Sequence, residues 1–393
     1  MNLSRFFADL HIHIGRTEGG LPVKISAAGN LTFDRIVQEA AHRKGIHMIG
    51  IIDSHSPPVQ GEIIQGLEKG RYQELQGGGL QYGGTTVILG AEIEVKKPGQ
   101  GAAHVLVYFP TLDCIRLFSQ WLSRYVRNMQ LSTQRFHGCV SALEEKVEEL
   151  EGILIPAHVF TPFKSVYGSA VDQMSQLLNL NKIAGVELGL SADTSMAEGI
   201  TELAPFTFLS NSDAHSLPKI GREYNELVMA RPDFQEWVLA LQREKGRHVS
   251  ANYGLDPKLG KYHRTRCGSC NESADPGEVR CVHCGGARKV KGVMDRIREI
   301  ADLKGEPLCH RPPYIYQVPL EFIPKLGKKT LEKLLNRFGT EMNILHKAPL
   351  QEIADTVGER IAAYIGLARE RRLEFEEGGG GTYGRVKAQV AEE

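Results

Sequence analysis

The sequence lacks three features that would each assign a protein class directly: net charge, long apolar runs and a phosphate-binding loop. Its 47 basic and 47 acidic residues cancel, so bulk charge identifies no partner and any nucleic-acid surface must be local. No run of about 18 apolar residues occurs, which excludes a conventional membrane-spanning helix. No Gly-x-x-x-x-Gly-Lys-Ser/Thr motif occurs either, which excludes a P-loop helicase.

Cysteine is also sparse, and its distribution argues against disulfide bonds. Four of the seven cysteines form two Cys-x-x-Cys pairs, whereas Cys114, Cys139 and Cys309 are scattered. A shared metal ion explains the clustered four better than disulfides do. Residues 1–6 lead directly into the first histidine motif, so we expect no cleaved signal, no membrane partner and a cytoplasmic location.

The N-terminal part of the chain alternates short apolar runs with helical patterns as far as about residue 225. This alternation predicts an α/β fold with parallel strands, and seven runs predict a seven-stranded (β/α) barrel. The predicted strands are residues 6–12, 46–52, 86–95, 104–109, 153–158, 183–188 and 206–209. The predicted helices are residues 32–44, 112–129, 142–150 and 170–180.

The rest of the 393-residue chain has a different composition, which predicts further modules. Little periodicity is visible around residues 246–292, and the proline-rich breaks at 305–307 and 311–313 predict a linker. The glycines at 378–381 predict a flexible tail, within which residues 382–386 form a short strand in an alternative interpretation. We therefore predict a barrel over 1–245, a basic four-cysteine module over 246–304, a helical domain over 305–373 and a tail over 374–393.

Potential metal ligands recur at the ends of the predicted strands, where the chemistry of α/β barrels lies. Alternate residues of a strand share one face, so His11 and His13 converge, as do Asp213 and His215. The candidate ligands of this site are His11, His13, Asp53, His55, Glu92, His104, His158, Asp213 and His215. This set exceeds the needs of one zinc ion, so we expect two or three divalent ions, Zn²⁺ with Mg²⁺ or Mn²⁺ as alternatives.

A multinuclear metal site activates water and holds phosphate oxygens, so phosphoester hydrolysis is the predicted reaction. The catalytic candidates are Glu92, as the bridging carboxylate, Asp193 and Asp213. Asp193 equally suits the N-cap of a following helix, and both interpretations stay open.

These motifs resemble those of the polymerase and histidinol phosphatase (PHP) superfamily of metal-dependent phosphoesterases. The matching motifs, in order, are His11-x-His13, Asp53, Glu92 and Asp213-x-His215. The resemblance covers about residues 5–225 and implies a distorted (β/α)7 barrel. Family members commonly carry Asp-His in the second motif, whereas this chain has Asp53-Ser54-His55. Whether Asp53, His55 or both bind metal therefore stays open.

Two cysteine knuckles follow the predicted barrel. Four thiolates, from Cys267, Cys270, Cys281 and Cys284, predict a closed structural Zn²⁺ site. The segment is rich in basic residues, which suits a phosphate backbone, although a solvated face on a small module is the alternative. The DNA-binding candidates of this segment are Arg264, Arg266, Arg288, Lys289 and Lys291.

The C-terminal helical pattern contains glycines at predicted turns. Backbone N–H groups exposed at the start of a helix form a phosphate site. The segment resembles a tandem helix-hairpin-helix module, a DNA-backbone binder without sequence specificity, with helical core packing alone as the alternative. The candidate residues are those of the first hairpin, Lys325, Gly327, Lys328 and Lys329, because the second hairpin, around Gly358, matches less well.

The order of these modules resembles that of the endonuclease Q family. The resemblance extends over nearly the whole chain and includes the motifs Pro156-Ala157-His158, Gly189-Leu190-Ser191 and Ser212-Asp213-Ala214-His215-Ser216. It implies a DNA repair endonuclease that nicks the phosphodiester bond on the 5′ side of a lesion. Our own hypothesis is that a monomer flips the lesion nucleotide out of the base stack before cleavage. The implied lesions are uracil, hypoxanthine, xanthine and abasic sites, and downstream repair proteins are possible partners. Two competing hypotheses are a phosphoesterase for small phosphomonoesters and a non-catalytic DNA-binding scaffold.

Overall fold

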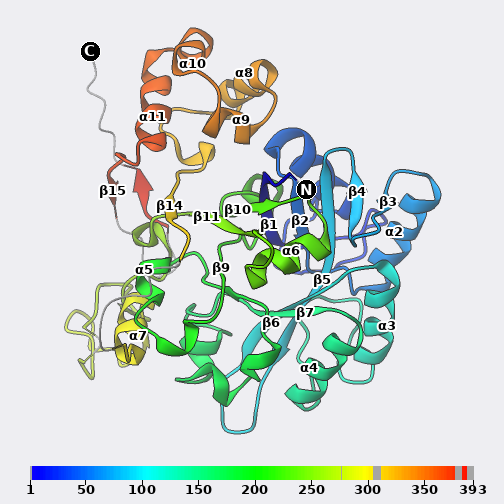
Figure 1. Ribbon diagram of the computed structural model, residues 1–393. Helices are drawn as coiled ribbons and strands as arrows, with labels where there is room; N and C mark the ends of the chain where they lie inside the picture. Colours follow the sequence, from blue (N-terminus) through cyan, green and yellow to red (C-terminus); the bar gives the residue numbers. More distant parts are fainter. Residues whose placement is uncertain (1, 276, 304–310, 377–382, 387–393) are drawn as a thin grey trace.

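A computed structural model describes residues 2–275, 277–303, 311–376 and 383–386. Figure 1 shows the barrel with a helical domain at its top and a small cysteine-containing module at its lower left. The predicted linker at 305–307, Cys309, the glycines at 378–381 and Thr382 lie outside the described residues. No described helix combines the length and the apolarity needed to cross a bilayer.

All seven predicted barrel strands are present. β1 pairs in parallel with β2, and β2 pairs in parallel with β5. Parallel bridges between Leu154 and Ile183 and between Ile12 and Ala214 complete the distorted barrel through β8 and β9. The barrel strands are β1 (Ser4–Ile12), β2 (Met48–Ile51), β5 (Thr85–Val95), β6 (Ala103–Phe109), β7 (Ile153–Pro156), β8 (Val186–Glu187) and β9 (Phe208–Leu209).

One strand runs against the expected direction. β6 pairs antiparallel with both β5 and β7. A parallel crossover needs about a dozen residues or more, and the loop between Val95 and Ala103 is too short for one. The first residues of β6, and not its last, therefore lie at the carboxyl edge of the barrel, where His104 pairs with Glu94.

The sheet continues past residue 245. β10 (Tyr224–Met229) pairs antiparallel with β1, and β11 (His248–Gly254) pairs antiparallel with β10. β11 falls in the segment where we expected little periodicity, because its polar residues hide the alternation: Asn252 is buried and donates to Phe208 O and Asn225 Oδ1. The other strands of this sheet are β14 (Tyr314–Tyr316), β3 (Gln73–Glu74) and β4 (Leu80–Tyr82).

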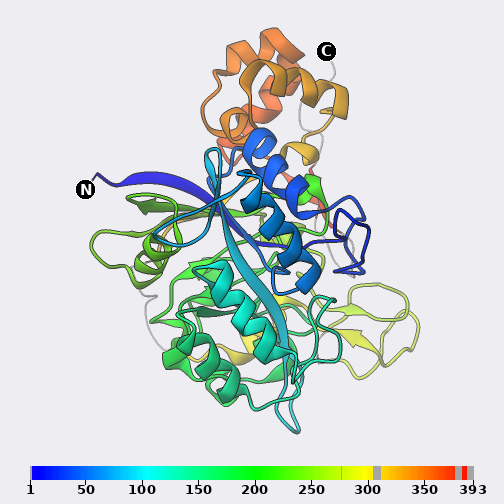
Figure 2. The ribbon, with the colours of Figure 1, turned by 90° about the vertical axis from the view of Figure 1, so that its right-hand side faces the viewer.

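Helices cover the outside of the barrel (Figure 2). The helix predicted over 170–180 is wrong, because this segment holds only a π-helical turn ending at Ala170 and a short 3₁₀ turn at Met174–Gln176. The Glu202 carboxylate accepts hydrogen bonds from the backbone N–H groups of Met174 and Ser175, a tertiary interaction that competes with helix formation. The helices of this part are α1 (Phe33–Gln38), the π-helix η1 (Glu39–Lys44), α2 (Pro57–Glu68), α3 (Leu112–Leu122), α4 (Val140–Glu149), α5 (Thr194–Ala197) and α6 (Phe234–Gln242).

The C-terminal helices have a hydrophobic core of their own and dock on the barrel through buried polar contacts. Lys44 Nζ lies 2.9 Å from the Glu341 carboxylate, and both side chains are buried. The His346 ring stacks on Phe7 and lies 2.6 Å from the hydroxyl of buried Tyr224. These contacts hold the helical domain in one orientation against the barrel. Its helices are α8 (Lys328–Phe338), α9 (Glu341–His346), α10 (Leu350–Val357) and α11 (Glu359–Arg369).

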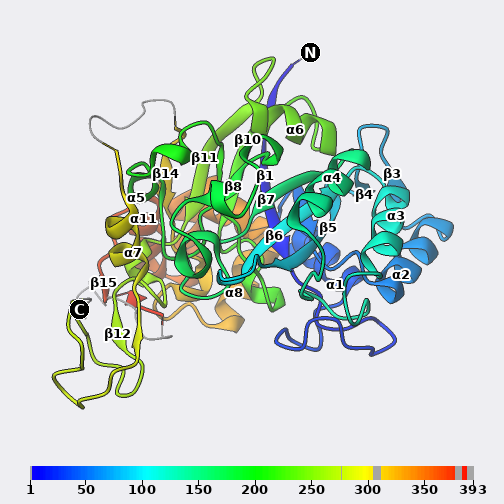
Figure 3. The ribbon, with the colours of Figure 1, turned by 90° about the horizontal axis from the view of Figure 1, so that it is seen from below.

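The cysteine module projects from the barrel at the side of β14 (Figure 3). Its short hairpin consists of β12 (Arg266–Cys267) and β13 (Lys289–Val290), followed by α7 (Val293–Ile300). Near the C-terminus, β15 (Phe375–Glu376) pairs antiparallel with β16 (Arg385–Val386). This hairpin includes part of the short strand that we considered at 382–386.

Candidate metal centre and nucleic-acid surfaces

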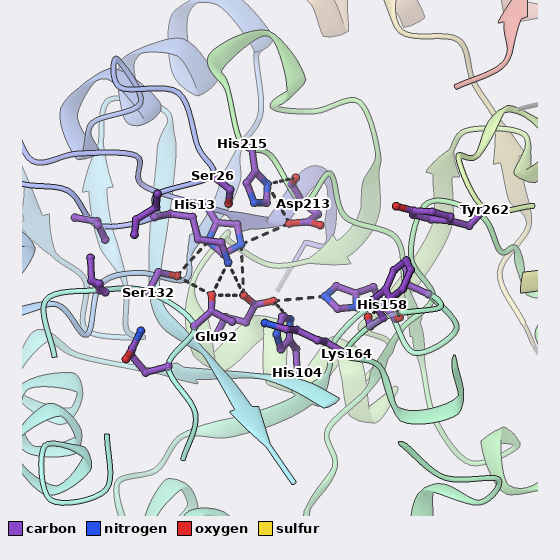
Figure 4. A pocket seen from close by; sticks show the side chains of 18 residues that line it. His13, Ser26, Glu92, His104, Ser132, His158, Lys164, Asp213, His215 and Tyr262 are labelled. Atoms are coloured by element: carbon purple, nitrogen blue, oxygen red, sulfur yellow. Dashed lines mark hydrogen bonds and ion pairs between the residues drawn. The ribbon is translucent and has the colours of Figure 1, made fainter. Parts of the chain in front are cut away.

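Seven of the predicted metal ligands meet beside one cavity, and Figure 4 shows the six of them that line it, all except His11. They form three overlapping groups, and the ligand atoms within each group lie within 4.8 Å of one another. We call these seven residues the barrel centre. Its groups are His11, His13 and Glu92; His13, Asp213 and His215; and Glu92, His104 and His158.

Glu92 joins two of the groups. Its Oε1 lies 3.4 Å from His158 Nε2 and 3.7 Å from His11 Nε2. Its Oε2 lies 3.6 Å from His13 Nε2. Donor atoms that share a tetrahedral zinc ion at about 2.0–2.1 Å lie about 3.4 Å apart, so this spacing fits metal ligands. His104 Nδ1 lies 2.8 Å from the same Oε1 atom.

Asp213 joins the remaining ligands. Its Oδ1 lies 3.4 Å from His11 Nε2 and 3.5 Å from His13 Nε2. The same oxygen lies 3.5 Å from His215 Nδ1. One carboxylate therefore faces three imidazoles that come from opposite ends of the barrel sequence.

Buried carboxylates orient the histidines from behind. Glu187 lies 3.0 Å from His11 Nδ1, and it also accepts hydrogen bonds from His158 N and Asn211 Nδ2. This leaves His11 Nε2 buried without a hydrogen-bond partner and facing the other ligands. A carboxylate behind a histidine is the usual second partner of a metal-bound imidazole.

Asp53 has the same relation to His13. Its Oδ2 lies 3.1 Å from His13 Nδ1 and accepts a hydrogen bond from Ile14 N at 2.7 Å. Among the described residues, neither Asp53 nor His55 belongs to a group of three ligands, although both are buried. The geometry therefore places Asp53 behind His13, whereas we expected these two residues as candidate ligands.

Asp193 caps a helix. Its Oδ1 accepts hydrogen bonds from Met196 N and Ser195 Oγ at the start of α5, and its Oδ2 accepts one from the Tyr316 hydroxyl. It belongs to none of the ligand groups found among the described residues. The N-cap interpretation thus has direct geometric support.

Two ligands have strained backbones. His158 has φ 30° and Asp213 has φ 45°, both in the left-handed region that residues other than glycine rarely adopt. Such strain persists where the surroundings impose it, commonly at functional sites. Gly189 supports this arrangement, because a Cβ added to it would lie 2.9 Å from His158 Cβ. Its own φ of 84° also requires glycine.

The electrostatics of the barrel centre favour cations. Burial alone would lower the pKa of His11, but the charges of Glu187 and Asp213 raise it to about 10. Burial opposes ionisation of Glu92, yet His104 and Lys24 hold its pKa well below its usual range. The carboxylates therefore stay ionised in a buried site, and the residues present fit divalent metal ions.

The cavity beside the barrel centre has a volume of about 590 Å³. Lys24 and Thr133 line it, as does Tyr262 from the segment that leads to the cysteine module. Phe163 stands at its rim, 52% exposed, with its ring 5.7 Å from that of Tyr262. The cavity thus lies between the metal ligands and the segment that leads to the cysteine module.

The C-terminal hairpin reaches the loop that carries Asp213. Arg222 Nε donates to Ser212 O at 2.7 Å, and its Nη1 donates to the Tyr383 hydroxyl at 2.7 Å. Lys261 Nζ lies 4.7 Å from the centre of the Tyr383 ring. This part of the predicted flexible tail is therefore packed near the barrel centre.

The four cysteines form a second candidate metal site. The Sγ atoms of Cys267 and Cys284 lie 3.6 Å apart, as do those of Cys270 and Cys281. Thiolates that share a zinc ion at about 2.3 Å lie about 3.8 Å apart, whereas a disulfide needs about 2 Å. Backbone N–H groups of Cys270 and Ser269 lower the pKa of Cys267. The four residues fit a closed zinc site.

The five DNA-binding candidates of this module all make contacts within the module. Lys289 Nζ donates to the carbonyl groups of Asp275 and Glu278, and Lys291 pairs with Glu299 at 2.6 Å. Arg266 Nη1 donates to Asn271 O, Arg264 lies 4.0 Å from Asp295, and the Arg288 side chain packs over Gly268. Much of this positive charge therefore also stabilises the module itself.

The first hairpin candidates in the helical domain are more accessible. Lys328 and Lys329 are exposed in the first turn of α8, with Gly327 as its N-cap. Lys325 is exposed two residues earlier, with φ 65°. In the weaker second unit, Gly358 has φ 96° and separates α10 from α11.

Several residues of the site were not predicted from the sequence. Glu187 was hidden inside the predicted strand 183–188, although an acidic residue in an apolar strand is a signal for a buried partner. Lys24 and Thr133 come from loops whose sequences show no motif. Only the folded chain shows that these loops meet at Glu92.

Comparison with known proteins identifies relatives along the whole chain. No protein-family model matches it. The uncharacterized protein YqxK of Bacillus subtilis is 50% identical over 387 residues, which cover 98% of this chain and 100% of YqxK. The uncharacterized protein MJ0043 of Methanocaldococcus jannaschii is 37% identical over 249 residues, 58% of this chain and 31% of MJ0043.

Two solved structures match nearly the full length. The lesion-specific endonuclease PfuEndoQ from Pyrococcus furiosus is 32% identical with a TM-score of 0.84, over 98% of this chain and 95% of that one. Endonuclease Q in complex with a 27-mer duplex substrate, with an abasic lesion at the active site, is also 32% identical with a TM-score of 0.84. The match covers 98% of this chain and 96% of that one.

Proposed function

The chain belongs to the endonuclease Q family, and on this premise we propose that it is a DNA repair endonuclease. It would nick the phosphodiester bond 5′ of uracil, hypoxanthine, xanthine and abasic sites. One observation carries the proposal: the barrel centre lies beside a cavity, in a chain that matches a protein crystallised with lesion-containing duplex at its active site.

Divalent ions bound at the barrel centre would supply an activated water and Lewis acidity for phosphodiester hydrolysis. His11, His104 and His158 would hold such ions, together with the shared carboxylates Glu92 and Asp213. Glu187 and Asp53 would fix the imidazole orientations from behind. The cysteine site would hold one Zn²⁺ with a structural role.

The cavity supports a flipped-out nucleotide as substrate. Its volume of about 590 Å³ lies within the range of sites that hold small molecules. Extrusion of a base costs a few kcal/mol, and it costs least for weakly paired lesions, so this step would contribute to selectivity. The exposed lysines of α8 and the basic cysteine module would grip the flanking duplex through its phosphates.

Cleavage of defined duplexes tests the proposal. We expect the protein, with Zn²⁺, Mg²⁺ or Mn²⁺, to nick duplexes that carry a single uracil, hypoxanthine, xanthine or abasic site, and to leave the undamaged duplex intact. The product length on a sequencing gel locates the nick relative to the lesion. Intact lesion strands with every metal would refute the proposal.

The same assay separates the two competing hypotheses. Hydrolysis of p-nitrophenyl phosphate without any duplex cleavage would identify a small-molecule phosphoesterase. Tight duplex binding without hydrolysis of either substrate would identify a scaffold. Metal analysis by mass spectrometry should find one zinc per chain that depends on the cysteines, and two or three further ions that depend on Glu92 and Asp213.

A further inference from the structure

A lysine lies among the metal ligands. Lys24 Nζ is 3.0 Å from Glu92 Oε2, and its side chain is only 14% exposed. A buried ammonium group is costly unless it is paired, and Glu92 is also a member of two ligand groups. Lys24 therefore places a permanent cation at the edge of a site built to hold cations.

Two loops hold this lysine in position. Backbone hydrogen bonds join Lys24 N to Ile14 O at 2.9 Å, just after β1, and Ser132 N to Val23 O at 2.9 Å. The second bond brings Thr133 beside the lysine, where its hydroxyl contacts both Lys24 Nζ and Glu92 Oε2. Thr133 has φ 53°, an unusual backbone for a β-branched residue. A strained residue in this position indicates that the arrangement has a function.

The ammonium group of Lys24 has one N–H donor left for a ligand. An ammonium carries three N–H donors. Glu92 Oε2 and the Thr133 hydroxyl accept two of them, and no other described residue accepts a hydrogen bond from Lys24 Nζ. Lys24, Asp213 and His215 line the same cavity. The remaining donor is therefore available to an oxygen that enters the cavity.

We propose that Lys24 is a catalytic residue that binds a non-bridging oxygen of the scissile phosphate. Its charge would stabilise the negative charge that builds on the phosphate oxygens in the transition state, and Thr133 would keep the ammonium group aligned. The proposal rests on the proposed phosphodiesterase function. It assigns to this chain a fixed protein cation that acts beside the metal ions.

Substitution of Lys24 tests this role. We expect Lys24→Met to lower the single-turnover rate on a uracil duplex by about 100-fold or more, the range seen for loss of one charge-stabilising donor. Metal content should stay within twofold of wild type and duplex affinity within threefold, because the contact acts in the transition state. The single-turnover rate of Lys24→Arg should be at least tenfold higher than that of Lys24→Met. Thr133→Val, which keeps the amine, should lose about tenfold.

The matched control is Lys97→Met. Lys97 follows β5, the strand that carries Glu92, but it is half-buried and its ammonium group donates to Gln176 O, so this variant should keep the wild-type rate. Thermal unfolding of each variant checks that it is folded. A Lys24→Met rate within threefold of wild type would overturn the proposal, and so would a loss of bound metal that accounts for the loss of rate.

A second substrate separates this proposal from the proposed function. The same variants are assayed on bis(p-nitrophenyl) phosphate, a diester that needs no DNA recognition. If wild type hydrolyses this diester but no lesion duplex, the DNA function fails while the role of Lys24 is still measured. If wild type hydrolyses neither substrate, both proposals are wrong.

Discussion

The two candidate metal sites of this chain are built in opposite ways. The barrel centre draws ligands from His11 to His215 beside a cavity. Four of its five histidines are buried, and carboxylates lie behind His11 and His13. The cysteine site draws four thiolates from Cys267 to Cys284, and Cys284 is exposed. Four thiolates fill the shell of a zinc ion, whereas shared carboxylates beside a cavity leave room for a substrate. The contrast supports the proposed catalytic role of the first site and a structural role for the second.

The largest expected effect comes from removal of a shared ligand of the barrel centre. Asp213→Ala should lower lesion cleavage by about 1,000-fold or more, beyond the 10–100-fold typical of residues behind the ligands. Duplex affinity should persist, because the basic surfaces are untouched. Single-turnover cleavage with a gel-shift measurement checks this. Cleavage by a folded, metal-depleted variant at the wild-type rate would contradict a catalytic barrel centre.

The second largest expected effect is a change of stability with pH, caused by a buried carboxyl group near the barrel centre. Burial raises the pKa of Glu223 from 4.5 to about 7, although Ser210 Oγ and Leu255 N donate hydrogen bonds to it. The folded state therefore keeps a proton that the unfolded state loses above pH 4.5. The free energy of unfolding should fall as pH rises from about 4.5 to about 7, by on the order of 3 kcal/mol from this group.

Glu223→Gln should remove that fall, because the amide stays neutral at every pH. Its carbonyl can still accept from Leu255 N, and its N–H can donate to Ser210. Urea unfolding of wild type and variant at pH 5 and pH 8 measures the difference. An equal loss of stability in both proteins would assign the pH dependence to other groups.

A smaller effect is expected behind the ligands. Glu187→Gln weakens the carboxylate support of His11 and should lower the metal affinity of the barrel centre 10–100-fold. Titration of metal-free protein with Zn²⁺ measures this. Glu202→Gln is the matched control, since Glu202 accepts a hydrogen bond from the Tyr167 hydroxyl and belongs to none of the ligand groups found in the described part of the chain. Equal affinities in the two variants would show that Glu187 does not tune the metal site.

The smallest effect on chemistry is expected at the cysteine site. Cys281→Ser should release one zinc per chain and weaken duplex binding about tenfold, because the basic residues of the module lose their fixed arrangement. Hydrolysis of bis(p-nitrophenyl) phosphate should stay within threefold of wild type. If the variant loses both the zinc and the small-diester activity, the barrel centre depends on the cysteine site, and the two sites are not independent.

Much of the fold was predictable from local patterns. The seven barrel strands follow apolar runs, and the C-terminal helices follow their periodicity. The direction of β6 was not predicted, although the short loop before Ala103 contained the information. The helix predicted over 170–180 failed because Glu202, from a distant segment, binds the backbone there.

The sequence by itself determined which residue types can bind metal and which of them share a strand face, because spacing along one strand or one knuckle is a local property. It thus predicted His11 with His13, Asp213 with His215, and the four cysteines. Only the tertiary structure decided how these pairs combine. The register of the barrel strands places Glu187 behind His11 and Asp53 behind His13, and loop packing brings Lys24 to Glu92. Distances between strands depend on barrel closure and on contacts between distant segments, and spacing along the chain does not encode them.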